Sequence, residues 1–432
     1  MIREIHASNF KSLKDVSVSL GELSVFCGPN ASGKTNFVEA LDFLAHVFRS
    51  GLQYAVSEKG GFYNICFRRV RRTKGAISFR VLSETKHGKN RNVTLEVSFS
   101  IRATSEAIRA EFIVEDENYR LRVSDQENSA EVGFLEIVRR DKKYIATAWV
   151  PSDDQFGELF GFRTLEELNN ILSNAFRPQA QQLLLTPLRA FSFGFFNRIR
   201  RSVAELEGLR VFQINPRTAR RAGTPSVTRG LGKHGENLPI VVDSFLNKRH
   251  LINRLLSWMQ DVIPALESLQ PGYTETKQVG LFLQEKGFGA PWYAEDLSDG
   301  TIMSLALFIC LLEPSHRTVV LEEPENCLHP WILKRFMDRC REISSVRQVL
   351  VTTHSPMVVA AAHPAELFLI ERKYGETTVT PAIQREEQLR TLIKKDFLDL
   401  GDYWMSGSLG AVPEAPDPTV LENVDSDEDV DR

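Results

Sequence analysis

The stretch GPNASGKT, residues 28–35, matches the pattern G-x-x-x-x-G-K-[ST] at every fixed position. Before it, SVSLGELSVFCG has the alternation and β-branched content of a strand, and after it TNFVEALDFLAHVF has apolar residues at helical spacing. A strand, a glycine loop and a helix in this order are the context in which the pattern forms a phosphate-binding loop. The stretch therefore predicts an α/β fold of the P-loop NTPase type.

Each fixed residue of this loop has a chemical role. Gly28 and Gly33 allow the backbone N–H groups to face phosphate oxygens, and the helix beginning near Lys34 adds the positive end of its dipole. We expect Lys34 to reach the β- and γ-phosphates of ATP and Thr35 to coordinate Mg²⁺. The predicted nucleotide-binding residues of this region are Gly28, Asn30, Gly33, Lys34, Thr35 and Asn36.

A second segment, TVVLEE at residues 318–323, is an apolar strand that ends in two carboxylates. Burying a carboxylate without a partner is costly, so a cation is expected beside it, and Mg²⁺ bound at the loop supplies one. Glu322 is predicted to hold the metal through water, and Glu323 to act as general base on the attacking water. This is a Walker B pattern in which Glu322 replaces the usual aspartate. The alternative is a pair of solvent-facing acids.

Two weaker motifs accompany these. LSDGT, residues 297–301, precedes a strongly apolar helix, and VLVTTHSP places His354 at the end of another predicted core strand. Ser298 and Gly300 are predicted to contact nucleotide, and His354 to take part in catalysis. Taken alone, Ser298 could be a helix cap and His354 a structural residue. The order of the four motifs along the chain favours the nucleotide site.

This order resembles the ATP-binding cassette (ABC) head of the SMC, RecF and OLD-type ATPases. The signature of that family is commonly LSGGQ, where this chain has Asp299 and Thr301. EEPENCLHP and THSP resemble the bacterial stand-alone AAA-type branch, which includes anti-phage defence ATPases. The resemblance covers residues 1–50 and 290–360 closely and the middle of the chain loosely.

The resemblance implies an ABC-type head with an antiparallel β subdomain and a helical insertion. It also implies a homodimer or larger homo-oligomer in which ATP is sandwiched between two heads. One subunit would supply Ser298 and Gly300. The other subunit would supply five residues: Lys34, Thr35, Glu322, Glu323 and His354.

A metal-sensing glutamine is also implied by the resemblance. Gln155 and Gln213 both follow strand-like runs, and the sequence does not choose between them.

Four segments are predicted along the chain. Residues 1–150 form an N-terminal lobe with the phosphate loop and antiparallel strands between 76 and 149, and residues 151–289 form a largely helical insertion. Residues 290–413 form a C-terminal lobe with the signature, Walker B, the loop after it and His354. Residues 414–432 are an acidic tail that is predicted to be disordered.

Composition narrows the class of protein. The 432 residues are 42% hydrophobic and 25% charged, and the five cysteines include no CxxC pair, so neither a disulfide framework nor a zinc site is expected. The N-terminus lacks the apolar core of a signal peptide, and no apolar run of about 18 residues is present to span a membrane. We expect a cytoplasmic protein without membrane contact.

Basic residues cluster in two stretches. Residues 68–91 contain nine Lys or Arg and one acid, and residues 198–221 contain seven Arg and two acids. Such clusters can contact a phosphate backbone, which makes DNA or RNA a candidate partner. Ion pairs within the chain are the alternative.

The favoured hypothesis, by resemblance, is an ATPase that controls a separately encoded effector, such as a Toprim or HNH nuclease, in anti-phage defence. The alternatives are a RecF-like DNA-repair ATPase and a nucleotide-stabilised scaffold with little turnover. No sustained heptad repeat is present, so an SMC-like tether is not expected. Fewer than 80 residues follow His354, so we expect no nuclease domain within this chain.

Overall fold

A six-stranded sheet lies at the centre of the computed structural model, in the order β16-β15-β3-β14-β13-β9. Its parallel strands are β3 (Leu23–Cys27), β14 (Gln348–Thr353), β13 (Thr318–Glu322), β9 (Leu209–Phe212) and β15 (Leu367–Lys373). The edge strand β16 (Glu376–Pro381) is antiparallel to β15. The structure describes residues 1–67, 75–87, 90–105, 110–126, 129–141, 143–152, 157, 159–188, 203–224, 230–385 and 399–410.

The central strands are buried on both faces, which explains why their sequences are continuously apolar. In β13, Val320 belongs to one core, together with apolar residues of α1 (Lys34–Ser50). Its neighbours Val319 and Leu321 belong to a second core, with residues of α11 (Asp299–Leu312) and α12 (Pro330–Ser344). Helix α1 therefore covers the opposite face of the sheet from α11 and α12, and it follows β3 directly through the glycine loop.

A seven-stranded antiparallel sheet has the order β2-β1-β4-β5-β6-β7-β8 and confirms the predicted antiparallel subdomain. Its strands are β1 (Ile2–Phe10), β2 (Leu13–Ser19), β4 (Ile77–His87), β5 (Arg91–Ala103), β6 (Phe112–Asp125), β7 (Glu131–Arg140) and β8 (Lys143–Trp149). The expectation of one strand over SVSLGELSVFCG is wrong. The segment splits at Leu20–Glu22 into β2, which pairs with β1, and β3, which enters the central sheet. Strand β2 alternates between buried and exposed residues whereas β3 is buried throughout, and the sequence pattern does not show that the chain changes its partner strand between them.

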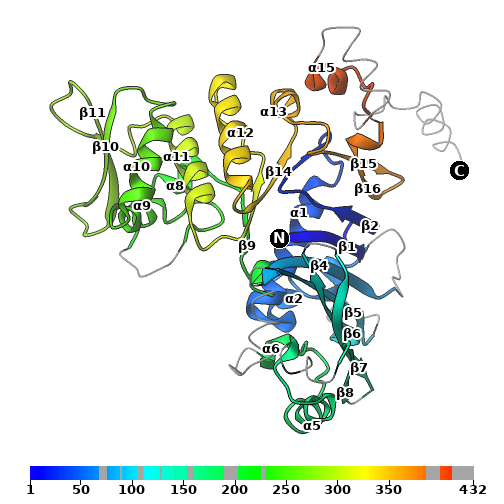
Figure 1. Cartoon of the computed structure of the whole chain (residues 1–432). Coiled ribbons are helices and arrows are strands. Elements are labelled where there is room, and N and C mark those ends of the chain that lie inside the picture. The colour runs from blue at the N-terminus through cyan, green and yellow to red at the C-terminus, as the bar shows by residue number, and fades with distance from the viewer. Residues whose placement is uncertain are drawn as a thin grey trace, which may run out of the picture.

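The segment 151–289, predicted to be largely helical, also contains strands. Its helices are α5 (Leu165–Ala175), α6 (Leu185–Leu188), α8 (Pro216–Ala219), α9 (Leu238–Leu246) and α10 (Arg249–Met259). Within the same segment, β9 joins the central sheet, and β10 (Leu266–Tyr273) and β11 (Val279–Glu285) pair with β12 (Trp292–Tyr293) in a third sheet. Figure 1 shows α5 beside β8 and α6 below α2, whereas α9 and α10 lie with β10 and β11 in another lobe. The segment is thus divided between two parts of the molecule.

The remaining elements are α2 (Leu52–Glu58), α3 (Phe62–Ile65), α13 (Pro356–Ala361), a 3₁₀ turn (Ala382–Arg385) and α15 (Leu400–Met405). None of the helices in the described ranges is both long enough and apolar enough to cross a membrane. The acidic tail and Gln155 lie outside the described residues, as do residues 68–74 and 198–202 of the basic stretches.

Candidate functional site

The strand register brings the predicted site residues to one edge of the central sheet. Cys27 of β3 lies opposite Thr353 of β14, and Thr352 lies opposite Glu322 of β13, so the three strands end at the same level. The glycine loop, His354 and Glu323 follow these ends directly. In parallel α/β sheets, ligands bind outside the carboxyl ends of the strands. The topology therefore places three of the four motifs at one edge of the central sheet.

The glycine loop has the backbone that its sequence predicts. Gly33 has φ 104°, and a side chain there would collide with Thr377 of β16, so only glycine fits. A side chain at Gly28 would collide with the carbonyl oxygen of Ile370 in β15. Asn30 is exposed at the outer turn of the loop. The C-terminal hairpin β15–β16 thus packs directly against the phosphate loop.

Lys34 lies buried at the start of α1. Its Nζ donates hydrogen bonds to the carbonyl oxygens of Gly28 at 2.8 Å and Pro29 at 2.9 Å. Burial lowers the pKa of Lys34, and the nearby carboxylates of Glu323, Glu325 and Glu322 partly oppose that shift. A cationic side chain held by loop carbonyls and faced by acids can turn toward an incoming phosphate.

Glu322 and Thr35 meet across the sheet edge. Burial raises the pKa of Glu322, and a hydrogen bond with the Thr35 side chain partly opposes that shift. A buried carboxylate beside a hydroxyl supplies the hard oxygen ligands that Mg²⁺ prefers, and a divalent cation would offset the cost of burying the charge. The two residues therefore fit the predicted metal site.

Glu323 leaves the strand in an unusual conformation. Its φ is 48°, in the left-handed region, and its N–H donates to the carbonyl oxygen of Thr352 at 2.9 Å. This turn directs successive glutamates to different surroundings, because Glu322 is buried whereas the Glu323 side chain is 30% exposed. Nδ1 of His354 lies 3.5 Å from Oε1 of Glu323. The structure therefore brings together the two predicted catalytic residues.

Glu325 is a site residue that the sequence analysis missed. Its Oε1 accepts hydrogen bonds from Thr353 Oγ1 at 2.7 Å and from the His354 backbone at 2.8 Å, and it lies 3.3 Å from His354 Nδ1. Its Oε2 is buried and has no hydrogen-bond partner among the described residues. The third acid in EEPE was the available signal, but its role depends on β14, which is distant in sequence.

Ser298 and Gly300 belong to a second cluster. Ser298 caps α11, since its Oγ accepts from the backbone N–H of Thr301 at 3.1 Å. A Cβ atom on Gly300 would lie 2.8 Å from the carbonyl oxygen of Cys327, so this glycine allows α11 to approach the loop after Glu323. Ser298 therefore has the helix-cap role that the sequence analysis gave as the alternative. The start of α11 lies at the surface beside the loop after Glu323.

Gln213 follows β9, which is parallel to β13 with Phe212 opposite Leu321. The next residues along the two strands are Gln213 and Glu322. Gln213 is exposed, and its backbone N–H donates to the carbonyl oxygen of Lys233 at 2.9 Å. The structure therefore places Gln213 at the site edge, a position that the sequence alone could not assign.

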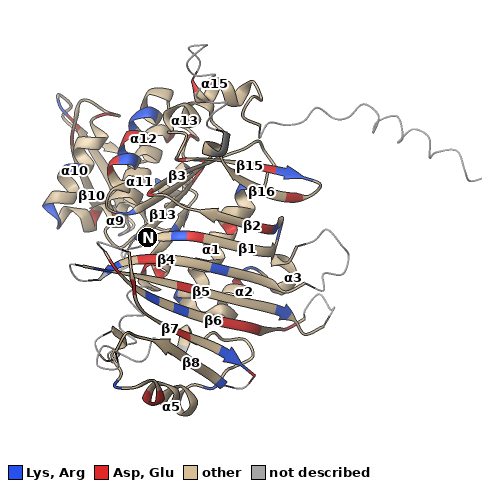
Figure 2. Cartoon of the chain, turned by 45° about the vertical axis from the view of Figure 1, so that its right-hand side comes forward, with Lys and Arg blue, Asp and Glu red and all other residues tan. Residues whose placement is uncertain are grey.

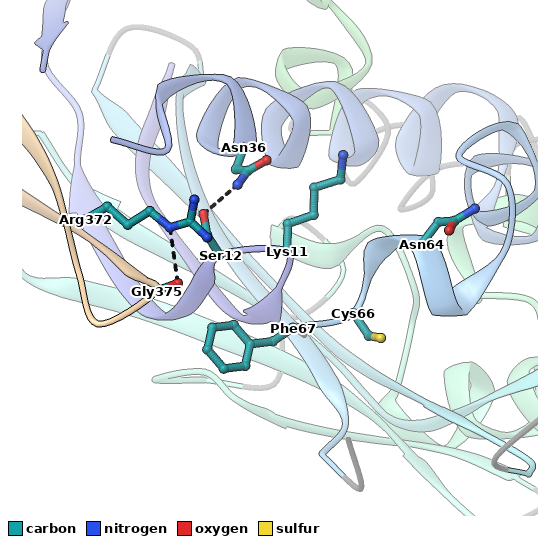
Figure 3. A pocket seen from close by; sticks show the side chains of 8 residues that line it. All are labelled: Lys11, Ser12, Asn36, Asn64, Cys66, Phe67, Arg372 and Gly375. Carbon is teal, nitrogen blue, oxygen red and sulfur yellow. Dashed lines mark hydrogen bonds between the residues drawn. The ribbon is translucent and has the colours of Figure 1, made fainter. Parts of the chain in front are cut away.

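A cavity of about 340 Å³ adjoins the first turn of α1. It is lined by Lys11, Ser12, Asn36, Asn64, Cys66, Phe67, Arg372 and Gly375. Figure 3 shows Asn36 pointing toward Ser12, to which its Nδ2 donates a hydrogen bond of 2.6 Å. The predicted nucleotide-binding residue Asn36 thus lines a polar pocket two residues beyond Lys34.

Solved structures with a similar arrangement include three SMC heads. The SmcHead bound to the C-winged helix domain of ScpA is 12% identical, with a TM-score of 0.47, 88% of this chain covered and 97% of that chain covered. The head from Thermotoga maritima is 14% identical, with a TM-score of 0.39 and coverage of 88% and 98%. The head with an extended coiled coil from Pyrococcus furiosus is 13% identical, with a TM-score of 0.43 and coverage of 91% and 99%. None of the curated proteins matches this chain.

The sequence matches the family described as "AAA domain, putative AbiEii toxin, Type IV TA system" over residues 23–360. This range holds the glycine loop, the signature segment, the two glutamates and His354, which are the motifs that the fold assembles. Together with the central sheet and its glycine loop, the match confirms an α/β P-loop NTPase fold with an antiparallel β subdomain. The chain belongs to this AAA-domain family.

Proposed function

We propose that the protein binds ATP with Mg²⁺ and hydrolyses it. The observation that carries the proposal is that β3, β14 and β13 end at the same level of the central sheet. The residues brought together at this edge are Lys34, Thr35, Glu322, Glu323 and His354. A lysine and a helix N-terminus favour a polyphosphate on one side of that edge, and carboxylates favour a metal and an attacking water on the other. Membership of an AAA-domain family supports the proposal that the ligand is a nucleotide.

The chain's residues then have separate tasks. Lys34 is placed to leave the loop carbonyls and pair with phosphate. Thr35 and Glu322 would hold Mg²⁺, which would supply charge neutralisation at the phosphates. Glu323 accepts the proton of the attacking water. His354 and Glu325 hold Glu323 in place through the contacts between His354 Nδ1 and both carboxylates. Gln213, which follows β9 beside Glu322 in register, would add an amide side chain to this edge of the sheet.

The pocket beside Asn36 would receive the rest of the nucleotide. It adjoins the helix whose N-terminus faces the phosphates, and its volume of about 340 Å³ is in the range of small-ligand sites. Its amide side chains can form hydrogen bonds with a base or sugar, and the Phe67 ring offers an apolar face. Loss of the Asn36 amide is therefore expected to weaken nucleotide affinity more than turnover.

We further propose that ATP joins two copies of the chain and that the pair controls a separately encoded effector. The first part is supported by the surface position of Ser298 and Gly300 beside the loop after Glu323. For the second part, the support is that the family description names a Type IV TA system, because toxin–antitoxin systems have two separately encoded components. In its more specific form, the proposal is that the effector is a nuclease and that the pair acts in anti-phage defence.

Nucleic-acid contact has less support from the described residues. Figure 2 shows basic and acidic residues interspersed along the seven-stranded sheet, and within the first basic stretch Arg80 forms ion pairs with Glu4 and Glu96. In the second basic stretch, Arg210 donates to backbone carbonyls and Arg220 pairs with an acid. DNA or RNA contact therefore stays a prediction for the undescribed residues of the two stretches.

The test compares Lys34→Ala with Lys334→Ala, which removes an exposed lysine of α12. Lys34→Ala should abolish Mg²⁺-dependent ATP binding and phosphate release, because the buried cation that meets the phosphates is lost. Lys334→Ala should retain both. Equal activity of the Lys34→Ala protein and the unchanged protein would reject the proposed site.

A further inference from the structure

Asp299 occupies the first position of α11, where the resembling family commonly has glycine. A carboxylate is favourable there for the helix itself, because the N-terminus carries partial positive charge. The side chain is 46% exposed, at the surface where α11 begins. If that surface receives a phosphate, an unneutralised carboxylate would repel it. The position therefore calls for a compensating charge.

Arg220 supplies that charge. Its Nη2 forms an ion pair with Oδ1 of Asp299, and its Nη1 donates to the backbone carbonyl oxygen of Glu295 at 3.0 Å. The Arg220 side chain is only 19% exposed, so it is fixed between the two partners. It thereby ties the segment after β12 to the first turn of α11.

The element that carries Arg220 is itself anchored. Arg220 ends α8, which is capped by the Asn215 side chain and contacts α11. The chain then returns through His234, whose backbone carbonyl accepts from the Asn215 N–H at 3.2 Å and whose ring lies 2.9 Å from the Gln213 carbonyl oxygen. The ion pair therefore links the loop beyond Gln213, at the edge of the metal site, to the start of α11.

We propose that Arg220 is a positioning residue that neutralises Asp299 and holds it aside, so that the start of α11 can accept the γ-phosphate bound to a second copy of the chain. This inference rests on the proposed ATPase, but it concerns a residue outside the four motifs. Under this proposal, Asp299 reduces ATP hydrolysis only when the Arg220 side chain is absent. The defect of an Arg220 variant must then depend on the acid it leaves behind.

The experiment measures kcat, KM and their salt dependence for Arg220→Ala, Asp299→Asn and the double variant, all in the full chain. Arg220→Ala should lower kcat/KM at least about 5-fold, because a carboxylate near the triphosphate is repulsive even when solvent screens it. Asp299→Asn alone should stay within about 2-fold of the unchanged protein, since the amide carries no charge to repel phosphate. The double variant should recover to the level of Asp299→Asn. Added salt should narrow the defect of Arg220→Ala, since salt screens repulsion between exposed charges.

The controls separate the two proposals. Arg220→Lys keeps the charge and should be less affected than Arg220→Ala, and melting temperatures show whether each variant is folded. A double variant as impaired as Arg220→Ala would overturn the inference, as would an Arg220→Ala protein of full activity. Both outcomes leave the ATPase intact provided that Lys34→Ala is inactive. If Lys34→Ala instead equals the unchanged protein, the proposed function fails first and the inference fails with it.

Discussion

At the residue scale, the two adjacent glutamates differ more than their sequence suggests. Glu322 ends β13 with its side chain buried against Thr35, whereas the left-handed turn at Glu323 directs that side chain toward His354. One carboxylate is thus desolvated and suited to a cation. The other is accessible to water and suited to proton transfer.

Replacing each glutamate by glutamine should separate these tasks. Because burial raises the pKa of Glu322 in the folded state, its charge reduces stability as the pH rises above the unfolded value of about 4.5. Glu322→Gln should therefore raise the Tm of the nucleotide-free protein at pH 7, with a smaller gain near pH 4.5, while weakening Mg²⁺ dependence. Glu323→Gln should leave that Tm nearly unchanged, retain ATP and slow hydrolysis about 100-fold to 10,000-fold. Calorimetry measures the Tm of each variant, and phosphate release measures its rate of hydrolysis. If Glu322→Gln showed the effects expected of Glu323→Gln, and the reverse, the assignment of the two roles would be wrong.

Residue roles that depend on local sequence were predictable, and roles that depend on distant strands were not. The loop around Lys34 and the pair Glu322 and Glu323 follow from motifs that are contiguous in the chain. Glu325 acquires its role from β14, and Gln213 from the register of β9 against β13. Both residues stand beside visible motifs, but the contacts that define their positions could not be predicted, because the partner strands are more than 20 residues away in the chain.

At the element scale, the sequence predicted α1 from its helical spacing, and β13 and β14 from apolar runs that end at a motif. The strand-like run before Gln213 is the four-residue strand β9, LRVF, but periodicity failed to show that this strand joins the central sheet. That strand is stabilised by parallel pairing with β13. It also failed to divide β2 from β3, because alternation records burial and not the identity of the neighbouring strand.

One element junction should show a pH-dependent stability. His316 lies between α11 and β13, packs 5.2 Å from the Phe212 ring, and lies 3.3 Å by Nδ1 from the Cys310 carbonyl oxygen. Burial, together with the charges of Arg210, Arg347 and Arg49, lowers its pKa from 6.5 to about 4, and the hydrogen bond with the Cys310 carbonyl partly opposes that shift. The unfolded state then binds the proton more readily, so stability present above pH 6.5 is lost as the pH falls toward 4.

His316→Gln should remove this pH-dependent part of the free energy of unfolding, which is on the order of 3 kcal/mol between the folded and unfolded pKa values. The measurement is the free energy of unfolding by urea between pH 4 and 7. The exposed His250, replaced in the same way, is the matched control and should leave the slope unchanged. Equal pH slopes for the His316→Gln protein and the unchanged protein would show that His316 is not the group responsible.

At the scale of the whole molecule, the site is divided between two surfaces. Lys34 and the carboxylates occupy the strand ends, while Ser298 and Gly300 stand at the start of α11, beyond the loop that contains Cys327. The free N–H groups of the α11 start favour an anion, and the Ser298 hydroxyl adds an oxygen near them. A second copy of the chain can bring these groups to a bound γ-phosphate. Under this proposal each complete site has residues from two chains.

Mixing two inactive proteins tests this arrangement. Lys34→Ala removes the phosphate contact of one surface, and Ser298→Arg blocks the other with a bulky side chain, so neither protein alone should hydrolyse ATP. In a mixed dimer, one site carries both changes and the other carries none, because each site takes Lys34 from one chain and Ser298 from its partner. Mixing should therefore restore part of the activity, measured as phosphate release per dimer. Hydrolysis by an isolated monomer, or no recovery in mixed dimers shown to turn over at a single site, would leave Ser298 with only the role of helix cap that its bond to Thr301 already provides.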